Sequence, residues 1–295
     1  MKEFKDRVAV ITGAASGIGY SMAERFAAEG MKVVLADVGD AALARAESAL
    51  QEKGAETLAV RTDVSKADDV NALAEKTIAA FGAVHIVCNN AGVTGGTDPV
   101  WKQPLESWQW TLGVNAWGII HGIRAFVPIM LQQGTEGHIV NTSSGSGLFP
   151  APPFSGPYVA SKYAVVAISE VLHLELTLMC SKVKVSVLCP GYVRTNIMRT
   201  NYHNLPEKLK RSQPVSNEFE QKLFELSSKS LKAGIPPEQV AGDVIEAIRN
   251  EQFYIFPNPE VMKIVRNRME CILTQQNPTL QVPKEQWELL KKVYG

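Results

Sequence analysis

A tyrosine and a lysine, Tyr158 and Lys162, stand four residues apart in the stretch Tyr-Val-Ala-Ser-Lys. On a helix this spacing places both side chains on one face. A phenol ionises at about pH 10, so it is a poor base at neutral pH unless a positive charge stabilises its anion. The lysine ammonium can supply that charge, which makes Tyr158 a candidate proton-transfer group. Because the pair also occurs by chance in many helices, its meaning depends on the rest of the chain.

A glycine-rich turn follows the first apolar run of the chain, where Gly13, Gly17 and Gly19 have the spacing G-x-x-x-G-x-G. Glycines between a strand and a helix let a dinucleotide pyrophosphate approach bare backbone and the helix N-terminus. The spacing differs from the G-x-G-x-x-G pattern of other dinucleotide-binding folds. The physical reason for the glycines still applies, but the exact pattern does not. Ser16 and Ile18 lie inside the turn and are expected to flank the pyrophosphate.

Asp37 ends the second apolar run. A carboxylate at that place can bind the adenosine ribose hydroxyls, and it repels a 2′-phosphate. Val38 and Gly39 follow, so no cation stands directly behind Asp37 to hold a phosphate. We therefore expect NAD as the cofactor in preference to NADP. The alternative for Asp37 alone is a solvated acid at a strand end.

The composition argues against several classes of partner. Lys and Arg number 30 and Asp and Glu number 30, for a formal net charge of +0, so no global field favours nucleic acid or an anionic membrane. No stretch reaches the ~18 uninterrupted apolar residues of a membrane span, and the first residues lack the apolar region of a signal peptide. The expected partner is a small molecule, and the expected location is the cytoplasm.

The cysteines form no C-x-x-C pair, and no histidines stand at metal-ligand spacing, so we expect no metal site. Reduced, mostly buried thiols are expected at Cys88, Cys180, Cys189 and Cys271. His121 and His173 are expected to be structural.

Strand-like apolar runs alternate with segments of helical period, which predicts an α/β fold with a doubly wound parallel sheet and helices on both faces. Predicted strands cover residues 8–12, 32–37, 57–61, 85–89, 138–142, 184–189 and 253–256. Predicted helices cover residues 18–29, 41–53, 68–81, 105–133 (interrupted around Gly113), 158–179 and 262–273.

With these elements in place, the chain resembles the short-chain dehydrogenases/reductases, which are single-domain Rossmann enzymes, over roughly residues 5–256. Further motifs of this family follow the predicted strands in order: Asp63-Val64, Asn89-Asn90-Ala91-Gly92, Asn115, Asn141-Thr142-Ser143-Ser144 and Pro190-Gly191. Each motif alone is weak, but their joint order is specific. We assign residues 1–256 to one catalytic domain with a substrate loop at about 192–235, and residues 257–295 to a C-terminal helical extension.

The resemblance implies reversible hydride transfer between NAD(H) and a secondary alcohol or ketone. Tyr158 would be the general base or acid, and Lys162 would lower its pKa and hold the nicotinamide ribose. Ser144 would donate a hydrogen bond to the substrate oxygen, and Asn115 would anchor, through its backbone or amide, a water that links Lys162 to solvent. Further cofactor contacts are expected at Asp63, Val64, Asn90, Ala91, Gly92, Pro190, Gly191, Val193 and Thr195.

Some of these roles have rivals. Ser143 or Ser146 could replace Ser144, because the segment 145–157 is longer and richer in proline than the usual family pattern. Asn115 could be an ordinary polar helix residue. A dinucleotide-binding scaffold or regulator without catalysis is the alternative to an enzyme, but the complete set of catalytic residues argues against it.

Apolar residues in the loops favour a medium or bulky hydrophobic substrate, although the same residues could be ordinary core. The residues assigned to the substrate site are Ser144, Ser146, Leu148, Phe154, Tyr192, Ile197 and Met198. A polyol or a 3-oxoacyl compound is the alternative substrate. The tail after residue 256 loosely resembles family members that act on bulky aryl or alicyclic carbinols, and it could equally pack subunits or cover the core. A homo-oligomer, dimer or tetramer, is expected because the helices over 105–133 and 158–179 carry more apolar residues than one sheet face can cover.

Overall fold

The computed structural model describes residues 1–96, 98–150, 153–198, 205–209, 225, 228–278 and 288. Its parallel sheet has the strand order β3-β2-β1-β4-β5-β6-β7. The strands are β1 (Val8–Thr12), β2 (Lys32–Asp37), β3 (Thr57–Arg61), β4 (Ile86–Asn89), β5 (Gly137–Thr142), β6 (Val183–Leu188) and β7 (Tyr254–Ile255). The α-helices include α1 (Gly17–Ala28), α2 (Asp40–Gln51), α3 (Ala67–Phe81), α4 (Leu105–Leu112), α5 (Gly118–Gln133), α6 (Gly156–Leu178), α9 (Pro237–Arg249) and α10 (Pro259–Leu273).

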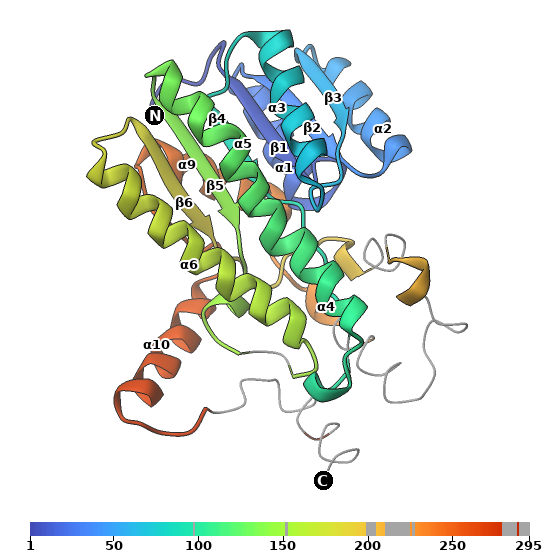
Figure 1. Ribbon diagram of the computed structural model, residues 1–295, viewed down its shortest axis with the longest axis vertical. Helices are drawn as coiled ribbons and strands as arrows, with labels where there is room; N and C mark the ends of the chain where they lie inside the picture. Colours follow the sequence, from blue (N-terminus) through green and yellow to red (C-terminus); the bar gives the residue numbers. More distant parts are fainter. Residues whose placement is uncertain are drawn as a thin grey trace.

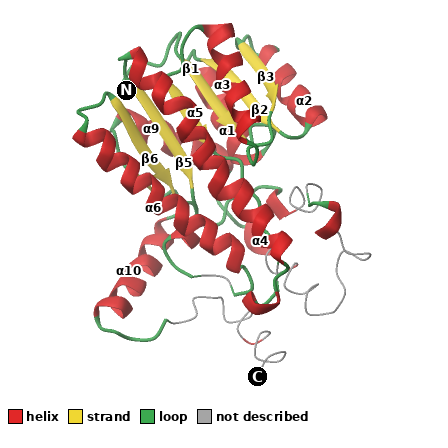
Figure 2. Cartoon of the chain, in the orientation of Figure 1, coloured by secondary structure: helices red, strands yellow, loops and turns green. Residues whose placement is uncertain are grey.

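Helices cover both faces of the sheet, as predicted (Figures 1 and 2). Ala9 and Ile11 of β1 join a core with residues of α1, α2 and α9, whereas Val8 and Val10 join a core with residues of α3, α5 and α6. Successive strand residues point to opposite faces, so a strand covered on both sides must be apolar throughout. This explains why the strands read as continuous apolar runs in the sequence.

The sheet reverses its direction of growth at β1, which pairs with β2 on one side and β4 on the other. In such sheets, ligands bind outside the carboxyl ends of the strands at this switch point. Thr12, the last residue of β1, accepts a hydrogen bond at its Oγ1 from the Asn90 backbone N–H at 2.9 Å. The predicted cofactor residues after β1 and β4 therefore lie together at the switch point.

The interruption predicted around Gly113 is a π-helical turn over Gly113–Trp117 that joins α4 to α5. The continuous helical stretch Leu105–Gln133 has the length and apolar composition of a membrane span, although polar residues interrupt its apolar run. Two observations identify it as a core helix: α5 packs against β4 and α3, and Phe126 is fully buried. The cytoplasmic location stays a prediction.

Helix α9 was absent from the prediction. It carries Val240, Val244 and Ile248 on one buried face, and it packs along α1. Arg249 at its end forms an ion pair with Glu29, the residue directly after α1, with 2.7 Å between Nη2 and Oε2. The apolar residues recur every four positions after a proline pair, so a helical signal was present in the sequence.

Smaller differences concern boundaries and thiols. Helix α10 begins at Pro259 rather than at residue 262, and α6 begins at Gly156 rather than at Tyr158. The expectation of mostly buried thiols holds for Cys88 and Cys189, but Cys180 is exposed and Cys271 is half-buried. Cys180 follows the end of α6, and burial there would require a partner surface.

A buried chain of polar side chains joins β4, β5 and α6 beneath the site. Asn89 Nδ2 donates to Asn141 Oδ1 at 2.9 Å, and Asn141 Nδ2 donates to Ser169 Oγ at 3.0 Å. Gly122 of α5 leaves room for this chain, because a Cβ there would lie 2.0 Å from Asn89 Oδ1. Each buried amide is therefore satisfied by a partner from another element.

We predict that Ser169→Ala lowers the free energy of unfolding by about 1–3 kcal/mol, because it leaves the Asn141 amide buried without a partner. Thr177→Ala is the matched control. Ser169 and Thr177 both donate to the carbonyl four residues earlier on α6, each at 2.7 Å, but Thr177 is exposed. Urea unfolding should show a change within about 0.5 kcal/mol for the control. Equal effects of the two substitutions would contradict the role of the buried chain.

Candidate active site

The turn between β1 and α1 is built for close approach to its backbone. Gly13 and Gly17 have φ of 66° and 55°, in the left-handed region that favours glycine. A Cβ on Gly19 would lie 2.1 Å from the Gly13 carbonyl oxygen, so only glycine fits there. Ser16 precedes α1, is exposed and makes no side-chain cap to the helix, which leaves the first N–H groups of α1 open to an anion.

Asp37 lies against this glycine turn. Its Oδ2 accepts a hydrogen bond from the Ala15 N–H at 3.1 Å, and its Oδ1 accepts one from the Gly39 N–H at 3.1 Å. The carboxylate is half-buried and held at the end of β2. The structure thus brings Asp37 and the glycine turn together, as the sequence predicted.

Asp63 and Val64 form the next part of the same edge. Burial would raise the pKa of Asp63, but hydrogen bonds from Ser65 and the nearby Lys66 ammonium outweigh it and hold that pKa below its usual value. The Val64 side chain is buried, and its carbonyl oxygen lies 2.9 Å from His121 Nδ1. The expected structural role of His121 agrees with this contact.

Asn90, Ala91 and Gly92 connect the glycine turn to the centre of the site. Asn90 Nδ2 donates to the Thr12 carbonyl at 3.0 Å, and the Ala91 N–H donates to Thr12 Oγ1 at 3.1 Å. A Cβ on Gly92 would lie 3.5 Å from Lys162 Nζ. The segment predicted to contact the cofactor, Asn90–Gly92, therefore runs up to Lys162.

Tyr158 and Lys162 share one face of α6, with Lys162 Nζ 5.7 Å from the centroid of the Tyr158 ring. The lysine is 3% exposed, and its Nζ donates to the Thr142 carbonyl oxygen at 2.9 Å. Burial lowers the pKa of Lys162 to about 8, while Cys189 acts in the opposite direction. The ammonium is therefore desolvated and close to the phenol.

The pKa of Tyr158 departs from the sequence-based expectation. Burial raises this pKa above its usual value of 10.0, and a hydrogen bond from Ser144 only partly opposes the rise. The expectation of a phenol whose pKa is lowered by Lys162 is wrong for the protein without ligands. The physical reason is that Lys162 directs its Nζ to the Thr142 carbonyl while burial penalises the phenolate.

The three candidate serines have different surroundings. Ser144 is the one whose hydroxyl reaches Tyr158. It also accepts a hydrogen bond from the Ser146 N–H at 3.1 Å and lies 3.5 Å from the Pro190 carbonyl oxygen. Ser143 is 2% exposed and donates to the Lys162 carbonyl at 2.8 Å, so it fixes β5 against α6. These contacts favour Ser144 over Ser143 as the hydroxyl that meets a substrate.

Asn115 is fully buried within the π-helical turn. Its Oδ1 accepts from the Val93 N–H at 2.8 Å, and its Nδ2 donates to the Val93 carbonyl and to Ser161 Oγ, each at 2.9 Å. The amide is thus committed to holding the chain after β4 against α6. Both N–H donors of the amide have partners, so a water held by Asn115 would bind its backbone carbonyl or the second lone pair of Oδ1.

The segment after β6 faces the glycine turn. The Pro190 carbonyl accepts a hydrogen bond from the Gly145 N–H at 2.7 Å, and Val193 bridges to Ile235. The Thr195 methyl carbon Cγ2 would lie 3.2 Å from a Cβ on Gly17. Thr195 therefore stands at the pyrophosphate turn, and Pro190 stands beside Ser144.

The predicted substrate residues have mixed surroundings. Leu148 packs against core residues, Phe154 is half-buried with a φ of 67°, and Ile197 and Met198 are half-buried. Tyr192 is 43% exposed, and its side chain is hydrogen-bonded to Ser230. Residues 151–152, 199–204, 210–224 and 226–227 of the two loops lie outside the described residues. Among the described residues, no group of three or more His, Cys, Asp or Glu could hold a metal ion.

Asn258, at the start of α10, was missed by the sequence reasoning. It is 1% exposed, and its Oδ1 accepts a hydrogen bond from the Gly191 N–H at 2.9 Å. An asparagine before a proline at a helix start predicts only a helix cap, so the sequence carried no signal for this contact.

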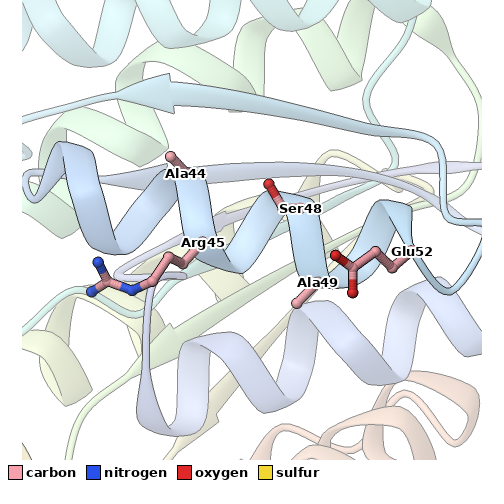
Figure 3. A pocket seen from close by; sticks show the side chains of 5 residues that line it. All are labelled: Ala44, Arg45, Ser48, Ala49 and Glu52. Carbon is pink, nitrogen blue, oxygen red and sulfur yellow. The ribbon is translucent and has the colours of Figure 1, made fainter.

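A hollow on α2 lies away from these groups (Figure 3). Four residues of this helix and the residue directly after it line the hollow: Ala44, Arg45, Ser48, Ala49 and Glu52. None of these residues belongs to the predicted site, and we assign the hollow no function.

Comparisons with known proteins agree with this geometry. The sequence model of the short chain dehydrogenase family matches residues 7–206. The chain is 31% identical over 283 residues to a CLA biosynthesis dehydrogenase/reductase of Lactiplantibacillus plantarum, covering 96% of this chain and 98% of that protein. It is 36% identical to a 1-deoxy-11-beta-hydroxypentalenate dehydrogenase of Streptomyces arenae, covering 90% of this chain and 87% of that protein.

Among solved structures, a short chain dehydrogenase/reductase from Burkholderia phymatum in complex with NAD is 42% identical and superposes with a TM-score of 0.90. The match covers 96% of this chain and 100% of that chain. The parallel sheet, the glycine turn and the Ser144, Tyr158 and Lys162 cluster thus occur in a chain that belongs to the short-chain dehydrogenase/reductase family of oxidoreductases.

Proposed function

We propose that the protein is an NAD-dependent dehydrogenase that interconverts a secondary alcohol and its ketone. The observation that carries the proposal is the cluster of Ser144, Tyr158 and Lys162 at the carboxyl ends of the strands, next to the glycine turn. The Ser144 hydroxyl is hydrogen-bonded to the Tyr158 side chain, and Lys162 Nζ lies 5.7 Å from the Tyr158 ring centroid. Together these groups can exchange a proton with a substrate oxygen and stabilise charge on it.

The residues present fit a bound dinucleotide. The glycine turn has no Cβ in the path of a pyrophosphate, the N-terminus of α1 is uncapped by Ser16, and the Asp37 carboxylate lies against the turn. We assign the pyrophosphate to this turn and the adenosine ribose to Asp37. The adenine would lie near Asp63 and Val64, and the nicotinamide end near Lys162, Pro190 and Thr195. Bound NAD supplies the acceptor for the hydride.

The chemistry of the chain's own residues is then proton transfer. In alcohol oxidation, the phenolate of Tyr158 takes the hydroxyl proton while the carbinol carbon gives up its hydride. In ketone reduction, the phenol of Tyr158 gives its proton to the carbonyl oxygen. Ser144 would donate a hydrogen bond to that oxygen, and Lys162 would hold the cofactor ribose while its positive charge favours the phenolate.

The raised pKa of Tyr158 determines whether this residue is a phenol or a phenolate at the start of alcohol oxidation and of ketone reduction. The free protein holds a neutral phenol at neutral pH, which is the form needed to reduce a ketone. Oxidation needs the phenolate, so we expect the oxidation rate to rise with pH, whereas reduction does not require a deprotonated Tyr158.

A medium or bulky hydrophobic alcohol or ketone is the substrate class that we propose. Leu148, Phe154, Ile197 and Met198 supply apolar side chains in the two loops assigned to the substrate, and apolar walls are usual in small-molecule sites. A polyol would need more hydrogen-bonding side chains. The alternative of a scaffold without catalysis is disfavoured. A scaffold would need neither the Ser144 hydroxyl beside Tyr158 nor the buried Lys162, and both are present.

We predict that Tyr158→Phe lowers turnover by roughly 10²- to 10⁴-fold, because it removes the proton-transfer oxygen while the ring and its packing stay. NADH binding should remain nearly unchanged. The matched control is Tyr163→Phe, since Tyr163 follows Lys162 on the same helix and stacks under Arg268 at 5.3 Å. The measurement is NADH formation with a panel of secondary alcohols that includes aryl carbinols, steroids and cyclic alcohols. A Tyr158→Phe protein with full turnover on its best substrate would remove Tyr158 from the mechanism.

The preference for NAD over NADP follows from the charges around Asp37. Arg61 is the register partner of Asp37 on β3, and it forms an ion pair with Asp40, with 3.4 Å between Nε and Oδ2. The positive charge of Arg61, the residue beside Asp37 in the sheet, is therefore neutralised by the Asp40 carboxylate. A 2′-phosphate at this edge would meet net negative charge.

We predict that Asp37→Ser weakens NAD binding and narrows the ratio of kcat/KM between NAD and NADP, because it removes both the ribose acceptor and the repulsion of the phosphate. Asp68→Ser, at an exposed acid in the first turn of α3, is the control and should leave the ratio unchanged. Wild-type protein that uses NADP at least as efficiently as NAD would show the assignment to be wrong.

We also propose a homo-oligomer that forms through α6. Val171, Leu174 and Leu178 lie along one exposed stripe of this helix and are 54%, 61% and 85% exposed. A large apolar stripe on a core helix is typical of a protein interface. Light scattering should show a dimer or tetramer at micromolar concentration, and Leu174→Glu should shift it toward the monomer. A monomeric wild type would contradict this proposal.

A further inference from the structure

Asn258 does not cap the helix that it begins. Asparagine before the first turn of a helix commonly accepts a hydrogen bond from that turn, but here the side chain makes no such bond to α10. Instead Oδ1 accepts from the Gly191 N–H at 2.9 Å, and Nδ2 donates to the Tyr192 carbonyl at 3.2 Å and to Glu260 Oε1 at 3.3 Å. The side chain thus acts as both acceptor and donor toward the segment after β6.

The contact is close and closed to water. Asn258 is 1% exposed, and Val261, one turn further along α10, is 2% exposed. A Cβ on Gly191 would lie 3.1 Å from Asn258 Cγ and 3.2 Å from Val261 Cγ2. The first turn of α10 therefore packs directly on Gly191, beyond the carboxyl ends of β5 and β6 (Figure 1).

The same segment reaches the catalytic serine. Pro190, next to Gly191, accepts a hydrogen bond at its carbonyl from the Gly145 N–H at 2.7 Å, and this carbonyl lies 3.5 Å from Ser144 Oγ. The Tyr192 carbonyl, in turn, also accepts from the Ile235 N–H at 3.1 Å. Asn258 therefore holds two peptide groups of this segment, 190–191 through the Gly191 N–H and 192–193 through the Tyr192 carbonyl, and the first of them also carries the Pro190 carbonyl.

We propose that Asn258 is a positioning residue for the nicotinamide end of the site: it holds the Pro190–Tyr192 turn in the shape that the cofactor and Ser144 require. This inference rests on the dinucleotide site that the proposed function assigns, and not on the substrate. It makes the start of α10 a part of the active site, although the sequence assigned everything after residue 256 to an extension. It also predicts an effect confined to one end of the dinucleotide, since Asn258 makes no contact with the glycine turn or Asp37.

The test compares two ligands by isothermal titration calorimetry. NADH occupies the whole site, whereas ADP occupies only the adenosine and pyrophosphate end. Asn258→Ala removes the hydrogen bonds to Gly191 and Tyr192, so we expect the Kd for NADH to rise about tenfold, the size of one or two lost hydrogen bonds, and the Kd for ADP to stay within about twofold. The control is Asn267→Ala, at an exposed asparagine on the same helix, which should change neither Kd.

Asn258→Asp keeps an acceptor for the Gly191 N–H and loses the donor to the Tyr192 carbonyl. We expect it to fold and to show an intermediate loss of NADH affinity, so the inference remains testable if the alanine variant does not fold. Wild-type affinity for NADH in both variants, or an equal loss for NADH and ADP, would overturn the positioning role. A wild type that binds NADH but oxidises no alcohol would contradict the proposed function and leave this inference standing. A wild type that binds no NADH would overturn both.

Discussion

The buried ammonium of Lys162 is the constraint on which the rest of the site depends. A lysine that is 3% exposed must be hydrogen-bonded or lose its charge, and in this protein its Nζ has the Thr142 carbonyl at 2.9 Å. Several features keep that geometry: Ser143 binds the Lys162 carbonyl, Gly92 leaves space beside Nζ, and α6 packs along β6. Burial lowers the pKa of Lys162 to about 8, so the ammonium is less strongly favoured than in an exposed lysine, although it still predominates at neutral pH.

The phenol of Tyr158 is governed by the same balance. Without a ligand, burial raises its pKa, and Lys162 does not offset this because its hydrogen bond is directed to the backbone of β5. The Ser144 hydroxyl is hydrogen-bonded to the phenol, so in the proposed mechanism the proton donor and the group that stabilises the substrate oxygen are arranged before substrate binds. In that mechanism the free protein holds the acid form of Tyr158, and the base form would depend on bound cofactor and substrate.

Most of the fold and the site could be predicted because their signals are local. Apolar runs revealed the strands, and the ends of β1, β2, β4 and β5 carried the glycine turn, Asp37, Asn90 and Ser144 in order. What could not be predicted depends on contacts between distant segments. The Asn115 amide is hydrogen-bonded to the Val93 backbone, and burial raises the pKa of Tyr158. Asn258 accepts a hydrogen bond from Gly191, 67 positions earlier in the sequence. Helix α9 is different, since its periodicity was present in the sequence and was overlooked.

The central claim is that Tyr158 is a neutral acid in the free protein and becomes a usable base only in the complete site. A tyrosinate absorbance titration tests it most directly, taken as the difference between wild type and Tyr158→Phe, with and without saturating NAD. The account predicts that the midpoint of the Tyr158 ionisation lies above the usual value of 10.0 in the free protein, and that this midpoint falls to a lower pH when NAD is bound. A Tyr158 that ionises well below pH 10 without NAD, or whose ionisation is unchanged by NAD, would contradict it.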